Sequence, residues 1–242
     1  MLRSVNELTA YIMQASDGEI GRCQDFLFDD RNRTVRYMVA KTAKWLPGRK
    51  VVVSPDFLEQ PDQIYENIPI KLTRKQIEDC PPLEEHQTVS RQYEIAYHEY
   101  CTLPLYLAGP VPMVAPPREE AVEESAEVSE NHLQSAIEIN GYTVEALDGD
   151  AGQVEDLLVD DQDWTLKFLI VDTGGILTRN KVLVSFDWLI EIGWADRKIR
   201  LNLPQEEIES SLSYDPDSAI GLDHYIETHR AYDRSDLWKQ LK

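Results

Sequence analysis

Two short stretches decide the fold of this chain: Asp-Gly-Glu-Ile-Gly at residues 17–21 and Asp-Gly-Asp-Ala-Gly at residues 148–152. The shift from residue 17 to residue 148 is 131 positions, and it aligns much of the remaining sequence without a gap. The pairs of identical residues that it joins include Ser4 with Ser135, Asp25 with Asp156, Thr34 with Thr165, Asp56 with Asp187, and Ile77 with Ile208. Gapless agreement over such a span indicates an internal duplication.

Each copy is predicted to form about five short strands joined by tight turns. An Asp-Gly dipeptide favours a hairpin turn because glycine tolerates a positive φ. Residues 34–42 alternate in the period of a half-buried strand, and further strands are expected at 22–28, 50–54 and 67–72. A small closed antiparallel sheet would leave none of these strands with an exposed edge, so we expect a barrel.

A short helix should end each barrel, beginning near Thr73 in the first copy and near Pro204 in the second. Thr73 and Gln76 have the spacing of a capping box, which satisfies the free amides of a helix start. A Pro-containing connector and an aromatic segment with helical spacing then follow each copy. In the first of these segments Tyr93, Tyr97 and Tyr100 fall on one helical face.

The sequence between the copies changes from Pro-rich to acidic, with six glutamates in residues 118–130. Such a composition is typical of a linker. The predicted organisation is a first domain at residues 1–101, a linker at 102–134 and a second domain at 135–242. Because a duplicated domain can imitate a homodimer, the two domains are expected to pair within the chain or through homodimerisation.

The repeated pattern resembles the PRC-barrel family, to which the H subunit of the photosynthetic reaction centre and the ribosome-maturation factor RimM belong. The matching elements are Asp-Gly-x-x-Gly followed by a mid-strand Asp, the Asp-Asp loop, and the strand at Lys50 with its twin at Lys181. The arrangement is most similar to bacterial tandem proteins of this family. The resemblance implies a mainly β fold of two tandem PRC-type barrels, each trailed by a short helical segment. It implies docking of a protein and carries no catalytic residue.

The charge balance excludes some partners. The chain has 242 residues with 24 Lys and Arg against 44 Asp and Glu, a formal net charge of −20. This charge repels nucleic-acid phosphates and anionic lipid surfaces. The longest apolar stretch, residues 102–117, is too short and too rich in proline to span a membrane. Three scattered cysteines fit a reducing compartment, so a cytoplasmic location is predicted.

No catalytic, cofactor-binding or metal-binding group is predicted. The acidic pairs at 29–30 and 160–161 lack the distal glutamate of a Ca²⁺ loop and are expected to form Asx-type hairpin loops. Asp25 and Asp156 are expected to bind a neighbouring backbone or basic group, with Lys50 and Lys181 as charge partners. The five histidines lack metal-ligand spacing and are expected on exposed helices: His86, His98, His132, His224 and His229.

Four glycines and several aromatic residues are the positions singled out. Gly18 and Gly149 should adopt positive φ in tight turns, and Gly21 and Gly152 should lie against a crossing strand. Trp45 and Trp164 fall in hairpin regions, where they either form a contact surface or cap the barrel core. The stripe of Tyr93, Tyr97 and Tyr100 either packs on its own barrel or meets a partner.

The leading hypothesis is therefore a non-enzymatic interaction or scaffold protein whose paired barrels present a composite surface to a protein partner. Two alternatives remain. One is a regulatory protein that binds a small ligand or a metal in the cleft between the barrels. The other is an auxiliary of ribosome assembly, by analogy of fold.

Overall fold

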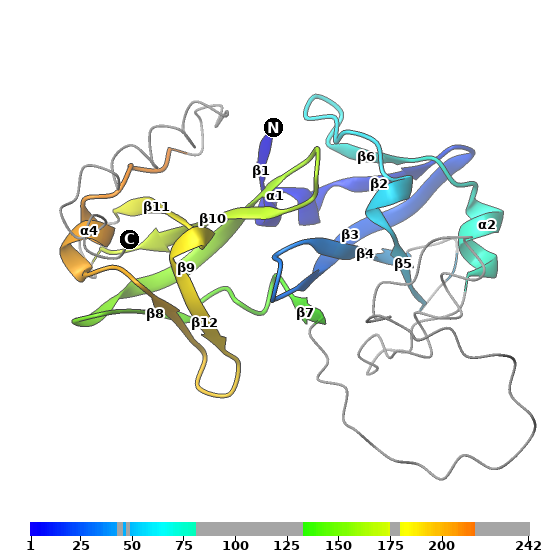
Figure 1. The fold of residues 1–242 in the computed structure, drawn as a ribbon. Helices are drawn as coiled ribbons and strands as arrows, with labels where there is room; N and C mark the ends of the chain where they lie inside the picture. Colours follow the sequence, from blue (N-terminus) through cyan, green and yellow to red (C-terminus); the bar gives the residue numbers. More distant parts are fainter. Residues whose placement is uncertain (43–45, 47–48, 81–132, 175–179, 216–242) are drawn as a thin grey trace, which may run out of the picture.

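The computed structural model describes residues 1–42, 46, 49–80, 133–174 and 180–215. These residues form two β-rich halves, each built on one mixed sheet, with a few short helices (Figure 1). The tyrosine stripe and all five histidines lie outside the described residues, as do Trp45 and Cys101.

The first sheet has the strand order β5-β4-β3-β2-β6, with β7 added beside β3. Its strands are β2 (Ile12–Ala15), β3 (Gly18–Asp29), β4 (Val35–Thr42), β5 (Lys50–Val53), β6 (Asn67–Ile70) and β7 (Leu133–Ser135). The helical elements of this half are α1 (Val5–Ala10), the 3₁₀ turn η1 (Pro55–Phe57) and α2 (Arg74–Asp79). Thr73 caps α2 and forms the predicted capping box with Gln76.

The second sheet has the order β11-β10-β9-β8-β13-β12, with β1 added beside β9. Its strands are β1 (Leu2–Ser4), β8 (Thr143–Ala146), β9 (Gly149–Asp160), β10 (Leu166–Asp172), β11 (Lys181–Ser185), β12 (Leu189–Gly193) and β13 (Lys198–Leu201). The 3₁₀ turn η2 (Phe186–Trp188) and the helix α4 (Gln205–Glu209) complete this half, and Pro204 precedes α4 as predicted.

The duplication is visible strand by strand. The long strands β3 and β9 have the same length, and the 131-residue shift places one on the other from end to end. Helix α2 and helix α4 follow the last strand of each half in the same way. The strands predicted at 22–28, 34–42, 50–54 and 67–72 correspond to β3, β4, β5 and β6.

Among the described residues the two sheets are mixed rather than purely antiparallel, and no closed barrel is detected. β6 pairs with β2 in parallel, β13 pairs with β8 in parallel, and the two end strands of each sheet do not pair with each other. β6 reaches β2 through a crossover that passes three intervening strands, so the chain can enter beside β2 in the same direction. Hydrophobic alternation marks which side of a strand is buried, and it carries no information on the direction of its neighbour.

Each sheet receives one short strand from the other half of the sequence. β1 pairs with β9, where Ser4 lies opposite Leu158, and β7 pairs with β3, where Ser135 lies opposite Leu27. Leu133 and Gln134, which the sequence assigned to the linker, belong to this exchanged strand. One hydrophobic cluster runs through both halves, and Phe28 of the first half packs on Trp194 of the second.

The repeated glycines lie at tight approaches. Gly18 and Gly149 open their long strands with φ of +148° and +153°. A Cβ on Gly21 would lie 2.2 Å from the carbonyl oxygen of Lys41, and a Cβ on Gly152 would lie 2.2 Å from that of Asp172. Both of these carbonyls belong to the neighbouring strand, so a side chain at either position would push two strands apart.

Replacing Gly152 or Gly21 with alanine should therefore destabilise the protein by roughly 2–5 kcal/mol, because strain at positive φ adds to a backbone clash. Gly141→Ala is the matched control. Gly141 also has a positive φ, of +80°, but nothing lies within 4 Å of its added Cβ. It should cost only about 1–2 kcal/mol. Urea unfolding of the three variants measures the difference, and equal losses at all three positions would contradict the clash.

Candidate binding cleft between the two halves

The two halves meet around Thr34 and Thr165, which are equivalent positions of the repeat. These two residues form an isolated antiparallel bridge. On one side the amide of Val35 donates to the carbonyl of Trp164 at 2.7 Å, and on the other the amide of Leu166 donates to the carbonyl of Arg33 at 2.9 Å. The contacts are the same under exchange of the halves, so the bridge marks a pseudo-two-fold axis.

A carboxylate of one half holds the exchanged strand of the other at two equivalent places. Ser135 Oγ donates to Asp25 Oδ2 at 2.7 Å, and the amide of Ile137 donates to Asp25 Oδ1 at 3.3 Å. In the twin arrangement Ser4 Oγ donates to Asp156 Oδ2, and the amide of Asn6 donates to Asp156 Oδ1 at 3.1 Å. We call these two arrangements the Asp–Ser braces.

The braces are the structural role that the sequence predicted for Asp25 and Asp156. Burial raises the pKa of both carboxyls above the usual range, although the serine and backbone donors oppose the shift. The positive charge of Lys50, an expected charge partner of Asp25, also opposes the rise in the pKa of Asp25. Lys181 instead forms an ion pair with Glu155 at 2.7 Å.

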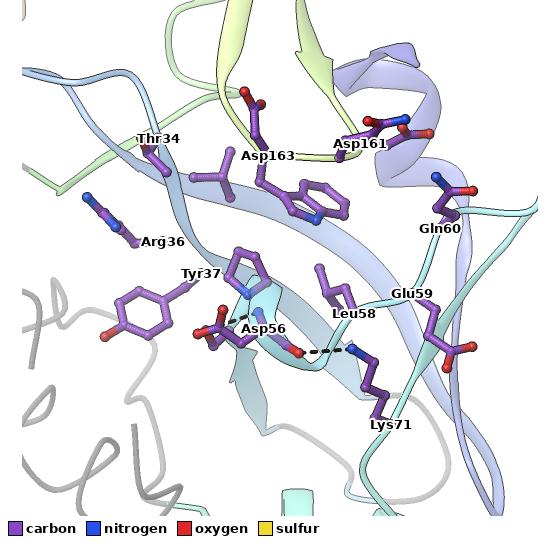
Figure 2. Close-up of a pocket in the computed structure, with 15 residues that line it drawn as sticks. Thr34, Arg36, Tyr37, Asp56, Leu58, Glu59, Gln60, Lys71, Asp161 and Asp163 are labelled. Atoms are coloured by element: carbon purple, nitrogen blue, oxygen red, sulfur yellow. Dashed lines mark hydrogen bonds between the residues drawn. The ribbon is translucent and has the colours of Figure 1, made fainter. Parts of the chain in front are cut away.

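A cleft of about 830 Å³ opens beside the pseudo-two-fold axis, with walls from both halves. The first half contributes the start of β4, the η1 segment and Lys71, and the second half contributes the turn between β9 and β10 (Figure 2). The residues that line it are Thr34, Val35, Arg36, Tyr37, Ser54, Pro55, Asp56, Leu58, Glu59, Gln60, Lys71, Asp161, Gln162, Asp163 and Trp164. The cleft exists only when the halves are joined.

The lining combines apolar and charged groups. Tyr37, Leu58 and Trp164 are buried, whereas the Asp56 and Glu59 side chains are exposed. The two acids of the second half are already paired with cations, Asp161 with Arg3 Nε at 3.0 Å and Asp163 with Lys167 Nζ at 2.8 Å. The lysine pair and local amide donors lower the pKa of Asp163 against the opposing effect of partial burial.

The acidic loops form the Asx turns that the sequence predicted. Asp29 Oδ1 accepts from the amide of Arg31 at 3.0 Å, and Asp160 Oδ1 accepts from the amide of Gln162 at 3.1 Å. In the part of the chain that the structure describes, no three His, Cys, Asp or Glu side chains are grouped to hold a metal ion.

Trp164 is only 6% exposed, so most of its indole is buried and the remainder lines the cleft. Its ring stacks on Phe26 of the first half with centroids 5.9 Å apart, which is the packing alternative considered for it. Cys23 and Cys80 are buried, and burial raises the pKa of the Cys23 thiol.

Sequence reasoning gave a cleft between the two copies as one alternative, but it did not identify the residues that line it. Asp56 was recognised as part of the repeat, but Leu58, Glu59 and Lys71 were not recognised as neighbours of residues 161–164. The one available signal was a mismatch inside the repeated turn, where Arg33 in the first copy corresponds to Trp164 in the second.

Comparison with known proteins adds no identity. No protein-family model matches the chain, and no curated protein matches it. Across the described ranges, every helix is too short or too polar to cross a membrane.

The braces make stability depend on pH in a definite direction. A carboxyl whose pKa is raised by folding above its ordinary value of 3.8 contributes stability that is complete below that value and lost as the pH rises through the folded pKa. The free energy of unfolding of the wild type minus that of Asp156→Asn should therefore be largest near pH 4 and smaller at pH 7. Asp25→Asn should behave alike. Denaturant titrations across this range measure the difference, and a difference that grows toward pH 7 would refute it.

Proposed function

We propose that this chain is a non-enzymatic protein-interaction module, and that its docking surface is the cleft between the two halves. The observation that carries the proposal is that both halves build the walls of this cleft. The exchanged strands and the Asp–Ser braces fix the walls relative to one another. A docking surface held in this way loses little conformational freedom when a partner binds.

The polar groups of the cleft support binding rather than catalysis. Asp161 and Asp163 are neutralised by cations, which removes two candidate general bases. Ser54 Oγ accepts from the amide of Asp56 at 3.4 Å and donates to its carboxylate at 3.3 Å, the arrangement of a cap for η1 rather than of an activated nucleophile.

The second candidate function is the binding of a small ligand in the same cleft, and the volume of the cleft supports it. Its volume of about 830 Å³ lies within the range of small-molecule sites, and its mixture of buried apolar side chains with a few charges is typical of them. Such a ligand would bind the same walls.

The resemblance to tandem PRC-barrel proteins and the cytoplasmic location remain parts of this proposal. The support for the first is the repeated Asp-Gly-x-x-Gly turn with its mid-strand aspartate, which supplies the braces in both halves. The support for the second is the small number of cysteines, two of which are buried.

Affinity capture from the source cell with the full-length chain tests the proposal. Gln60→Arg with Gln162→Arg would fill the cleft, and Gln153→Arg is a matched control because this exposed residue does not line it. We expect the wild type and the control to capture the same proteins. The double variant should bind these proteins about tenfold more weakly, which corresponds to a loss of about 1.4 kcal/mol of binding free energy.

Equal capture by all three chains would place the docking surface elsewhere and contradict the proposal. Native mass spectrometry of the purified chain separates the second candidate. A small molecule that remains bound to the control and is lost from the double variant would favour the ligand over the protein partner.

A further inference from the structure

The repeat supplies an internal comparison for the cleft, because Arg33 and Trp164 occupy the same position in equivalent turns. Both have a positive φ, of 63° and 53° respectively. The amide of Arg33 donates to the carbonyl of Asp29 at 2.7 Å, and the amide of Trp164 donates to that of Asp160 at 2.8 Å. Since their backbones match, the two turns differ mainly in the side chain that each presents to the other half.

In one copy this side chain neutralises a carboxylate of the opposite half. Arg33 Nη1 lies 2.8 Å from Oδ1 of Asp187, which belongs to η2. The amide of Asp187 donates to Ser185 Oγ at 3.2 Å, so the carboxylate is held at the start of that turn. The ion pair therefore joins the two halves directly across the pseudo-two-fold axis.

In the other copy the carboxylate remains and its arginine is missing. Asp56 is the repeat equivalent of Asp187, but Trp164 stands where Arg33 would be, and an indole carries no positive charge. Among the described residues no Lys or Arg nitrogen forms an ion pair with the Asp56 carboxylate. Lys71 Nζ instead donates to the main-chain oxygen of Asp56 at 3.3 Å (Figure 2).

We propose that an arginine of a protein partner takes the place that Arg33 takes in the other copy. Its guanidinium would pair with Asp56, and its aliphatic carbons would lie against Leu58 and the indole of Trp164, which line the same cleft. The inference rests on the proposed function of the cleft as a docking surface, and it specifies the chemistry of the segment that docks.

Charge complementarity selects this occupant. The net charge of −20 attracts a basic segment and repels a phosphate-bearing one. Glu59 is a second exposed carboxylate in the lining, which also holds the cationic side chains of Arg36 and Lys71. The attraction for a basic segment therefore comes from the net charge of the chain and from the Asp56 carboxylate itself. A guanidinium is favoured over an ammonium because its planar fork matches a carboxylate and is less strongly hydrated, as the Arg33–Asp187 pair illustrates.

The test uses a blocked Gly-Arg-Gly peptide and its citrulline analogue, which has nearly the same shape without the charge. Each is titrated into the ¹⁵N-labelled full-length chain, while NMR follows the amide of Asp56 and the indole N–H of Trp164. We expect a dissociation constant in the millimolar range for the arginine peptide and binding about fivefold weaker for the citrulline peptide, as for an exposed ion pair.

Three variants locate the interaction. Asp56→Asn should weaken binding of the arginine peptide about fivefold, and Lys71→Met should strengthen it about twofold by removing a nearby positive charge. Asp187→Asn is the matched control, because it removes the equivalent carboxylate outside the cleft, and it should leave the dissociation constant unchanged.

Equal affinity for the two peptides, or equal effects of Asp56→Asn and Asp187→Asn, would overturn the inference. Capture of a partner that is sensitive to filling the cleft but insensitive to Asp56→Asn would overturn it while leaving the proposed function intact. A third contrary result would be a small cation that copurifies with the wild type and is absent from Asp56→Asn. That result would show that a free ligand pairs with Asp56, and it would overturn the proposal that an arginine of a protein partner does so.

Discussion

Two carboxylates at the junction of the halves fix the arrangement on which the rest of this structure depends. Asp25 and Asp156 each accept hydrogen bonds from a serine hydroxyl and a backbone amide of the opposite half. A buried carboxylate without such donors would be costly, so each half is complete only when the exchanged strand of the other is in place. The exchange also lets one hydrophobic cluster run through both halves. Burial of this shared core stabilises both halves together.

Symmetry in the backbone leaves the side chains free to differ. The bridge between Thr34 and Thr165, the paired amide contacts on either side and the two braces all repeat under exchange of the halves. These contacts use main-chain groups and short polar side chains, so both copies must retain them. The side chain at the position of Arg33 and Trp164 takes part in none of these symmetric contacts, so it can differ between the copies. One copy uses it to close an ion pair across the axis, and the other leaves a carboxylate at the wall of a cleft. A pseudo-symmetric framework of this kind lets the two copies present different surfaces, where an exact dimer would present the same surface twice.

The charge of the whole chain and the charge of the cleft act over different distances. The net charge of −20 extends a negative potential to about a Debye length and attracts basic partners in general. Within the cleft, the acids of the second half are already paired with Arg3 and Lys167. The first-half wall carries the carboxylates of Asp56 and Glu59 and the cations of Arg36 and Lys71. In the proposed function, the long-range potential guides the encounter with a partner, and the local arrangement of charged and apolar groups selects it.

The sequence by itself determined the duplication, the main strands, the capped helix after Thr73, the Asx turns and the structural role of Asp25 and Asp156. These features depend on local backbone preferences or on identity between the copies, both of which can be seen in the order of residues. Only the tertiary structure decided that the sheets are mixed and open, that Trp164 is buried, and that Leu133 and Gln134 form a strand. The same holds for the cleft, because its walls come from segments that lie 90 or more residues apart in the sequence. Such segments pair because strand edges and buried carboxylates of one half need hydrogen-bond partners from the other half. A local sequence pattern does not show which groups need these partners.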